Sequence, residues 1–411
     1  MKPSKSLVSL LAGTAMLATT QQSMAAGFYL TQIGTPLSIG TVGVVNSVNT
    51  WGADTAWAQP AGMVNLKEDT VHTAGVSLLS GKIEFDSSIA GKGGSDGGNA
   101  SDPAIIPSYF YVKKLSDRTS MGLAVTAPIG GAMDYGDNFV GRYAATEVAL
   151  QGLGISPSIG YKVNDQLSIG AGVSIIYTMF EQELAINRGP SSDGKVEMED
   201  LDDWGYQPFF GLTYKFSDQL QLGVTYRAEA ETELEGDLKI TGLPLPKGSV
   251  DIEWDNPQWL EAAISYDMGN NYFIGANLGW QEWSAFSENA LTLATGPVDV
   301  VTVLDRDWDD TWRTGVAFGH YAGDSGWSFG VSYDSSPVSD SKRTIDLPMD
   351  ETWQVGTSYF KLGEKYDLAL SAALMYLGDG KVDQTAQGVR FKGDFDRNLL
   401  FNLGASFRYQ F

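Results

Sequence analysis

The 411-residue chain contains no cysteine and carries a net charge of −23 at pH 7. A fold held together by disulfides is therefore excluded, and the acidic balance argues against nucleic-acid binding, which needs a basic surface. The length fits two or three soluble domains, but a single β-barrel can also reach it.

The first residues have the pattern of a secretory signal peptide. Lys2 and Lys5 precede a largely apolar run from Leu7 to Ala18, and Ser23-Met24-Ala25 follows as a small-x-small cleavage site. The apolar run is too short to span a bilayer comfortably as an anchor helix. We therefore predict a signal peptide at residues 1–25 and an exported protein.

Residues 26–67 show little apolar alternation, because glycines interrupt them and small residues dominate 41–49. This pattern predicts an irregular or short-helical segment. A piece of this size buries too little apolar surface to fold alone. We expect it to pack against or inside something larger.

From about Asp69 onward, apolar and polar residues alternate in run after run. In the last stretch, Phe401 to Phe411, odd positions are mostly apolar or aromatic and even positions are small or polar. Successive side chains of a strand point to opposite faces. Such a strand can cover a soluble core, or it can face lipid on one side and a polar lumen on the other.

The spacing of turns decides between these alternatives. Tyr161 to Gly170 resembles Tyr214 to Gly223, and both contain an Asn/Ser-Asp turn whose side chain can bond its own backbone. Short turns alternate with seven long hydrophilic connections, which is the rhythm of an outer-membrane barrel. The connections are Asp86–Asp102, Asp134–Thr146, Asn187–Asp203, Thr241–Gly248, Thr295–Asp305, Asp334–Pro348 and Gly378–Asn398.

We therefore predict an all-β membrane protein, with an antiparallel transmembrane β-barrel of about fourteen strands in residues 68–411. Alternation assigns the faces: Leu220 and Leu222 point to lipid, whereas Arg227 points to the lumen. By the same parity, Glu229, Glu231 and Glu233 also face the lumen. The strands start near Asp69, Ala104, Thr119, Glu147, Leu167, Trp204, Leu220, Val250, Tyr272, Asp307, Trp327, Glu351, Tyr366 and Leu399.

Several short motifs, in this order along a predicted fourteen-stranded barrel, resemble the FadL/TodX family of outer-membrane transporters. These proteins take up long-chain fatty acids and other hydrophobic molecules. The matching motifs are Ala26-Gly27-Phe28, Ala53 to Met63, Phe139 to Arg142, Glu282 to Phe286, Ser336 to Val338 and Asp346 to Pro348.

The resemblance implies a mechanism of passive, hatch-gated diffusion. Residues 26–67 would form a hatch that plugs the lumen, and substrate would leave sideways through the wall beside a kink in the third strand. Gln59, Pro60 and Ala61 match the family's Asn-Pro-Ala gating motif, with Gln59 in place of asparagine. Pro128 and Gly130 match the kink, although a proline there can also simply end the strand.

The resemblance also implies a mostly apolar ligand pocket with few polar anchors. Phe28 is a candidate for its lining, or else for packing under the hatch. A fatty-acid carboxylate would need a cation, and the candidates are Arg142, Arg227, Arg313 and Arg408. An ion pair between Arg227 and Glu229 is the competing interpretation, because buried charges are normally paired. The acidic residues Glu181 and Glu183 leave room for an uncharged substrate.

We expect no enzyme, cofactor or metal site, since His72 and His320 are the only histidines and no catalytic constellation surrounds them. Two other functions remain open: a general diffusion porin, and a structural or adhesive barrel acting through its extracellular loops. The predicted partners are a hydrophobic small molecule, outer-membrane lipid and lipopolysaccharide, and the barrel-assembly machinery, which would read the terminal aromatic Phe411. No nucleic acid is expected, and the resemblance implies a monomer.

Overall fold

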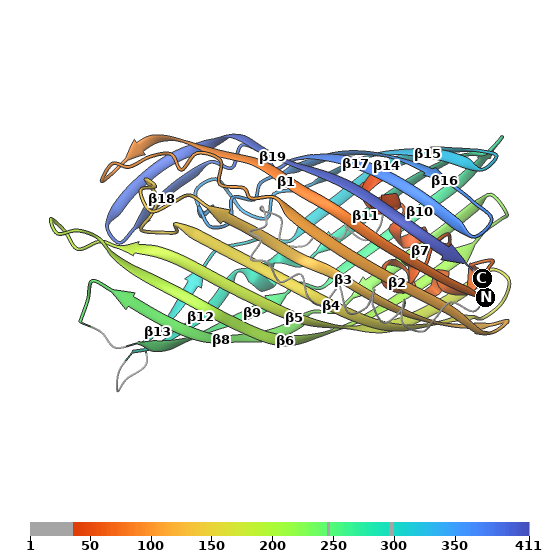
Figure 1. Cartoon of the computed structure of the whole chain (residues 1–411), viewed down its shortest axis with the longest axis horizontal. Coiled ribbons are helices and arrows are strands. Elements are labelled where there is room, and N and C mark those ends of the chain that lie inside the picture. The colour runs from red at the N-terminus through yellow and green to blue at the C-terminus, as the bar shows by residue number, and fades with distance from the viewer. Residues whose placement is uncertain (1–35, 245–246, 296–299, 411) are drawn as a thin grey trace, which may run out of the picture.

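The computed structural model describes residues 36–410 apart from 245–246 and 296–299. Figure 1 shows one elongated barrel with the C-terminus and the start of the described chain at the same end. The predicted signal peptide and the Ala26-Gly27-Phe28 motif lie outside the described residues.

Fourteen strands close the wall, and every neighbouring pair is antiparallel, which confirms the predicted fold class. The ring closes where the first strand pairs with the last, from Val71 opposite Gln410 to Ala90 opposite Phe391. In ring order the strands are β1 (Thr70–Ala90), β2 (Ala104–Ser116), β3 (Thr119–Asp134), β4 (Glu147–Lys162), β5 (Leu167–Ile186), β6 (Gly194–Lys215), β7 (Leu220–Arg227), β10 (Trp259–Gly269), β11 (Tyr272–Gln281), β14 (Thr311–Ala322), β15 (Ser325–Asp334), β16 (Thr352–Lys361), β17 (Tyr366–Tyr376) and β19 (Val389–Gln410).

Five further strands extend the wall at the end that carries the long connections, on the left of Figure 1. β8 pairs with the first half of β6 and with β9, β9 pairs with β12, β12 with β13, and β18 with β19. Their bounds are β8 (Ala230–Thr241), β9 (Gly248–Asn256), β12 (Glu288–Ala294), β13 (Val300–Asp305) and β18 (Val382–Ala386).

The break between β7 and β8 corrects one expectation about the lumen. β7 ends at Arg227 and β8 begins at Ala230, so the alternation restarts on the other parity. Leu234 is buried, whereas Glu231 and Glu233 are exposed on the outer face. The prediction that Glu231 and Glu233 face the lumen is therefore wrong.

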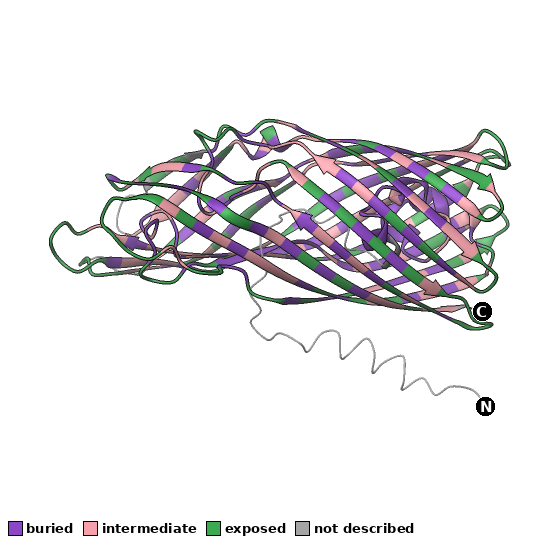
Figure 2. Cartoon of the chain, turned by 90° about the horizontal axis from the view of Figure 1, so that it is seen from above, coloured by how far each residue is buried: buried purple, intermediate pink, exposed green. Residues whose placement is uncertain are grey.

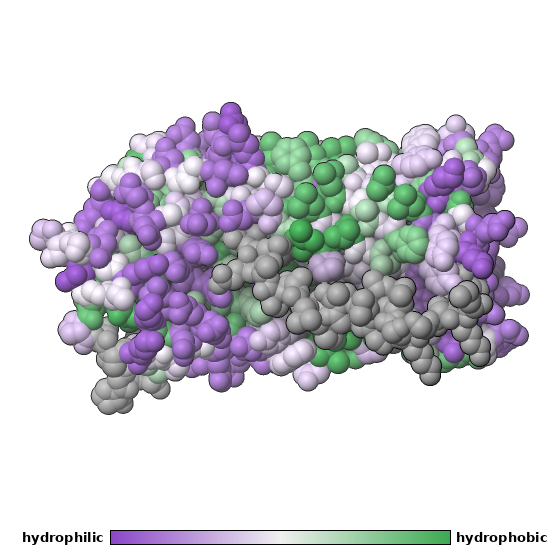
Figure 3. Space-filling model, in the orientation of Figure 1, coloured by the Kyte–Doolittle hydropathy of each residue, from purple (hydrophilic) through white to green (hydrophobic). Residues whose placement is uncertain are grey.

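The wall has the alternation that a barrel in lipid requires. Buried and exposed stripes alternate along the strands in Figure 2, and a hydrophobic band crosses the surface in Figure 3. Phe401, Leu403 and Phe407 of β19 are 46–55% exposed, whereas Asn402 is buried on the inner face. No helix in the described part of the chain has the length and apolarity to cross a membrane.

The short turns form as their sequences predict. Asn164 Oδ1 accepts hydrogen bonds from the backbone of Gln166 at 2.9 Å and of Leu167 at 2.8 Å. Ser217 Oγ makes the equivalent pair of bonds in the turn between β6 and β7. These side chains satisfy backbone amide groups that have no partner in the strand ladder.

The described part of the predicted hatch, residues 36–67, lies inside the barrel near the short-turn end (Figures 1 and 2). We call this segment the hatch. Gln59 caps its last helical turn by accepting a hydrogen bond from Ala61 N, and Pro60 occupies the first helical position, where no amide donor is needed. The hatch contains α2 (Pro36–Gly40), η1 (Asn46–Val48), α3 (Thr55–Ala58) and η2 (Pro60–Asn65), and a further short helix, η3 (Trp283–Phe286), lies between β11 and β12.

Candidate functional site: the hatch, the lumen and a break in the wall

The hatch touches the wall through a belt of glycines. At ten lumen-facing glycines, each on a different strand, a Cβ atom would lie closer than 3.0 Å to a hatch atom. A larger residue at these positions would hold the hatch backbone away from the wall. The belt consists of Gly122, Gly160, Gly170, Gly211, Gly223, Gly275, Gly315, Gly330, Gly356 and Gly404.

Lumen-facing arginines hold the hatch backbone. The hatch has little regular structure, so many of its carbonyl groups need partners outside it. Three wall arginines, all predicted as lumenal cations, each donate a hydrogen bond to one hatch carbonyl. The pairs are Arg227 with Trp57 O, Arg313 with Val42 O and Arg408 with Trp51 O.

Arg227 is enclosed by aromatic rings. Its guanidinium lies 4.4 Å from the centre of the Trp57 ring, 4.3 Å from Phe209 and 5.6 Å from Trp259. It also donates to Ser174 Oγ at 2.9 Å. Arg227 thus joins β5, β6, β7 and the hatch through one side chain. The predicted pair with Glu229 assumed a continuous strand, and β7 ends at Arg227.

Arg313 and Arg408 are ion-paired inside the lumen. Arg313 contacts Asp334 at 3.0 Å, and Arg408 contacts Asp367 and Glu68, each at 3.1 Å. Charges buried in this way are normally compensated by a partner of opposite sign. Carboxylates of this chain therefore occupy the positions that a substrate carboxylate would take.

The Gln59-Pro60-Ala61 motif packs against the wall opposite the start of the hatch. Gln59 Nε2 donates to Ser47 O at 2.6 Å and to Leu212 O and Val224 O, both at 3.2 Å. Pro60 lies against Gly160, Gly170 and Gly211 of β4, β5 and β6. The motif therefore fixes the hatch to these strands, and the hatch meets β3 through other residues.

The ladder between β2 and β3 is interrupted. Both strands are fully described, and their register runs from Ser116 opposite Thr119 to Tyr109 opposite Val125 and no further. Beyond that rung β2 continues to Ala104 beside β1, and β3 continues to Asp134 beside β4. We call this stretch the wall break.

Pro128 and Gly130 border the wall break. The register of β3 with β4 shifts between Thr126 and Ile129, so Pro128 lies in a bulge, and Gly130 pairs with Gln151 beyond it. Proline has no amide donor, and bulges bend the strand that carries them. Pro128 therefore lies within β3 and does not end it.

The far end of the wall break is closed by the connection between β1 and β2. Ala100 N donates to Ile83 O at 2.9 Å, and Ala100 O accepts from Asp134 N at 2.9 Å. The break is thus bounded by Ala100 at the long-loop end and by the Tyr109–Val125 rung at the hatch end.

Arg142 lies far from the hatch, among the long loops. It pairs with Asp193 at 2.9 Å and donates to Gly93 O and Phe139 O. Burial alone would raise the pKa of Asp193, but the hydrogen bonds from Arg142 and Tyr143 hold it below its usual range. Arg142 therefore ties three extracellular connections together.

The interior of the long-loop half is apolar and rich in aromatic rings. The Phe85 ring contacts Phe139, Phe391 and Phe395, and Phe139 also contacts Phe391. A second group, Trp254, Trp283, Phe286 and Trp308, packs around the start of β14. Three of these residues, Phe139, Phe391 and Phe395, lie in stretches read as hydrophilic loops, and the sequence did not place any of the eight in a common apolar interior. A signal existed for Phe139, Trp283 and Phe286, which lie in motifs that carry the family resemblance.

The sequence profile of one family, described as "Outer membrane protein transport protein (OMPP1/FadL/TodX)", matches residues 16–411. The chain belongs to this family. It is therefore an outer-membrane transport protein, as the motifs predicted, and members of the family are transporters or channels.

Relatives and solved structures agree with this assignment. The long-chain fatty acid transport protein of Escherichia coli O6:H1 is 22% identical over 354 residues, which covers 76% of this chain and 78% of the relative. A Pseudomonas aeruginosa FadL homologue has a TM-score of 0.84 at 19% identity and covers 94% and 100% of the two chains. The Pseudomonas putida toluene transporter TodX has a TM-score of 0.73 at 16% identity, with 93% and 99% covered. At these identities the structural likeness shows the shared barrel.

Proposed function

We propose that this protein takes up small hydrophobic molecules, long-chain fatty acids or hydrocarbons, and releases them sideways through the wall break. It works by passive diffusion and has no catalytic role. One observation carries this proposal: the ladder between β2 and β3 stops at the Tyr109–Val125 rung although both strands continue, and the Pro128 bulge lies beside this break.

The hatch makes the axial route unfavourable. To open the axial route, the hatch would have to separate from the glycine belt. Its carbonyl groups would then lose their hydrogen bonds to the wall arginines, and each loss would cost free energy. A hydrophobic molecule gains nothing from an aqueous axial channel in any case. A general diffusion porin needs an open channel, so the filled lumen does not favour that alternative, nor does the family favour an adhesive barrel.

The pairing of the candidate arginines bears on the substrate. Arg142, Arg313 and Arg408 each contact a carboxylate of the chain itself. Because these charges are already compensated, an uncharged hydrocarbon fits the lumen at least as well as a fatty-acid anion. Contact with lipopolysaccharide, delivery by the barrel-assembly machinery and a monomeric state stay predictions.

The test removes the bulge and keeps the barrel. On β3, Thr126 and Ile129 are three positions apart, whereas their partners on β4 are two positions apart. Deleting Pro128 removes this extra residue, so β3 can pair with β4 in continuous register. We expect uptake of radiolabelled oleate or toluene to fall to background in cells that lack other transporters of this family. Pro157→Ala is the matched control, because Pro157 lies opposite Leu123, where the register between β3 and β4 is unshifted. Normal uptake by the deletion variant, with a folded barrel, would refute lateral exit.

A further inference from the structure

The connection between β15 and β16 folds into the barrel. Within residues 335–350, Val338, Ile345 and Leu347 are at most 4% exposed and belong to the same apolar cluster as the aromatic rings of the wall. A surface loop between two strands would expose most of its side chains. We call this segment the inner loop.

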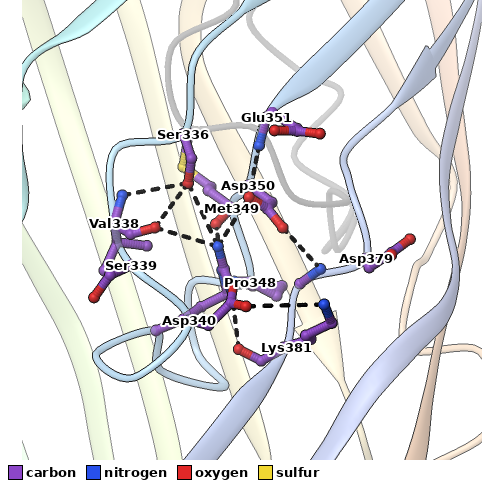
Figure 4. Close-up of polar contacts among 12 residues, drawn as sticks. Ser336, Val338, Ser339, Asp340, Pro348, Met349, Asp350, Glu351, Asp379 and Lys381 are labelled. Carbon is purple, nitrogen blue, oxygen red and sulfur yellow. Dashed lines mark hydrogen bonds and ion pairs between the residues drawn. The ribbon is translucent and has the colours of Figure 1, made fainter.

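Arg343 holds the inner loop together as one unit. Its side chain is 1% exposed and forms ion pairs with Asp340 and Asp350, both at 2.9 Å. It also donates to Met349 O at 2.7 Å and to Lys381 O at 3.0 Å, across to the connection between β17 and β18 (Figure 4). These bonds close the loop on itself, so it can move only as a whole.

Arg306, from the neighbouring part of the wall, also supports the inner loop. Arg306, just beyond β13, donates to Thr344 Oγ1 at 3.1 Å and pairs with Asp346 at 2.9 Å. The Arg306 guanidinium lies 5.5 Å from the centre of the Phe286 ring. Since β13 leads into β14, which pairs with β15, these bonds fasten the loop near its own base.

One bond reaches across the lumen. Tyr135, which follows β3 directly, donates its hydroxyl to Ile345 O at 3.0 Å, and both residues are buried. The Tyr135 ring stacks on Phe139, with centroids 4.4 Å apart. β3 and β15 lie on opposite sides of the ring of strands, so the inner loop meets the far wall at this bond.

We propose that the inner loop is a second closure of the transport route, at the extracellular end, and that the Tyr135–Ile345 bond is its catch. A hydrophobic molecule entering from outside displaces the loop from Tyr135 and passes into the apolar interior. Tyr135 directly follows β3, which borders the wall break. Breaking the Tyr135–Ile345 bond therefore also frees the end of β3 next to Tyr135. This inference rests on the proposed function for its direction of transport.

The competing interpretation is a static brace. The bonds of Arg343 and Arg306 fit either interpretation, because they lie within the loop or near its base. The Tyr135 bond distinguishes them, because it is a single neutral hydrogen bond between elements that share no other strand pairing.

The first measurement follows the loop itself. Because the chain has no cysteine, spin labels on Asp137→Cys and Ser341→Cys, both at exposed positions, are the only labels present. We expect the distribution of distances between the two spin labels to shift to longer values when oleate or toluene is added. Tyr135→Phe keeps the ring on Phe139 and should shift the distribution without either molecule. An unchanged distribution in both cases would overturn the proposal.

The second measurement follows uptake. Losing one buried neutral hydrogen bond should increase the open population, and with it the uptake of the labelled probe, about fivefold. Tyr226→Phe is the matched control, since its hydroxyl bonds Gln258 away from the inner loop. Uptake by Tyr135→Phe equal to the wild-type value would overturn the catch. Absence of uptake by the wild type would instead refute the proposed function, and the spin-label distances would still decide whether the loop opens.

Discussion

Arg227 on β7 donates a hydrogen bond to the carbonyl of Trp57 in the hatch, and its guanidinium lies over the ring of the same residue. One wall side chain thus satisfies a hatch backbone group and packs against a hatch side chain. The same relation, a wall arginine bonded to a hatch carbonyl, recurs at Arg313 and Arg408. The strength of these contacts can be measured.

Replacing Arg227 with methionine should loosen the hatch. The substitution keeps an unbranched side chain but removes a charged donor, whose loss costs about 1.5–3 kcal/mol. We expect faster hydrogen exchange at the amides of α3. Arg397→Met is the control, because Arg397 forms only an exposed pair with Glu84, which contributes about 0–1 kcal/mol. Equal exchange rates in the two variants would contradict the role of Arg227.

Adding one methyl group to the glycine belt should displace the hatch. In Gly223→Ala the new Cβ would overlap Ser47 O, whereas in Gly279→Ala the nearest atom is 3.5 Å away. We expect Gly223→Ala to raise the conductance of planar bilayers towards that of a variant lacking residues 26–65, and Gly279→Ala to leave it low. High conductance in the unmodified protein would show that the hatch does not seal the lumen.

Restoring the family's asparagine in Gln59→Asn should weaken the hatch attachment. The shorter side chain draws the amide back by about 1.5 Å, too far for its bonds to Leu212 O and Val224 O. Two lost bonds cost about 2 kcal/mol together. We expect a lower thermal unfolding temperature in detergent, and no change for Gln166→Asn in an exposed turn. An unchanged unfolding temperature for Gln59→Asn would mean that other contacts fix the motif.

The inner loop should resist moderate acid. Burial alone would raise the pKa of Asp346, but the facing Arg306 outweighs it and holds this pKa below 3.8, while Tyr135 nearby stays neutral because burial raises its pKa. A lowered pKa means that the stabilisation is complete above 3.8 and is lost as the pH falls through the folded value. We expect identical spin-label distances at pH 8 and pH 5 and longer distances only below about pH 3.8. Asp346→Asn should give the longer distances at every pH. If the distances of the unmodified loop changed near pH 6 instead, a group other than Asp346 would control its opening.

The barrel could be predicted from the sequence because its causes are local. Alternation along each strand and turns such as the one at Asn164 depend on neighbouring residues, and the fourteen strands follow from them. The broken strands were harder, because the gap between Arg227 and Ala230 changes which residues face the lumen without changing the composition.

The contacts of the candidate site could not be predicted in this way. Arg227 and Trp57 are 170 positions apart, and Tyr135 and Ile345 are 210 apart. The sequence indicated that lumenal arginines exist and that buried charges need partners, but not that backbone carbonyls of the hatch would be among them. The roles of Phe28, Gln59, Pro60, Ala61, Pro128 and Gly130 in transport stay predictions.

The glycine belt also constrains how the protein is assembled. Ten of the fourteen strands approach the hatch so closely that a single Cβ atom would collide. A folded hatch therefore cannot slide into a finished cylinder. Since the hatch precedes β1, and the β1–β19 seam is the last pairing the chain can make, the growing sheet has to wrap around the hatch and seal over it. The hatch thus also acts as a template around which the barrel assembles.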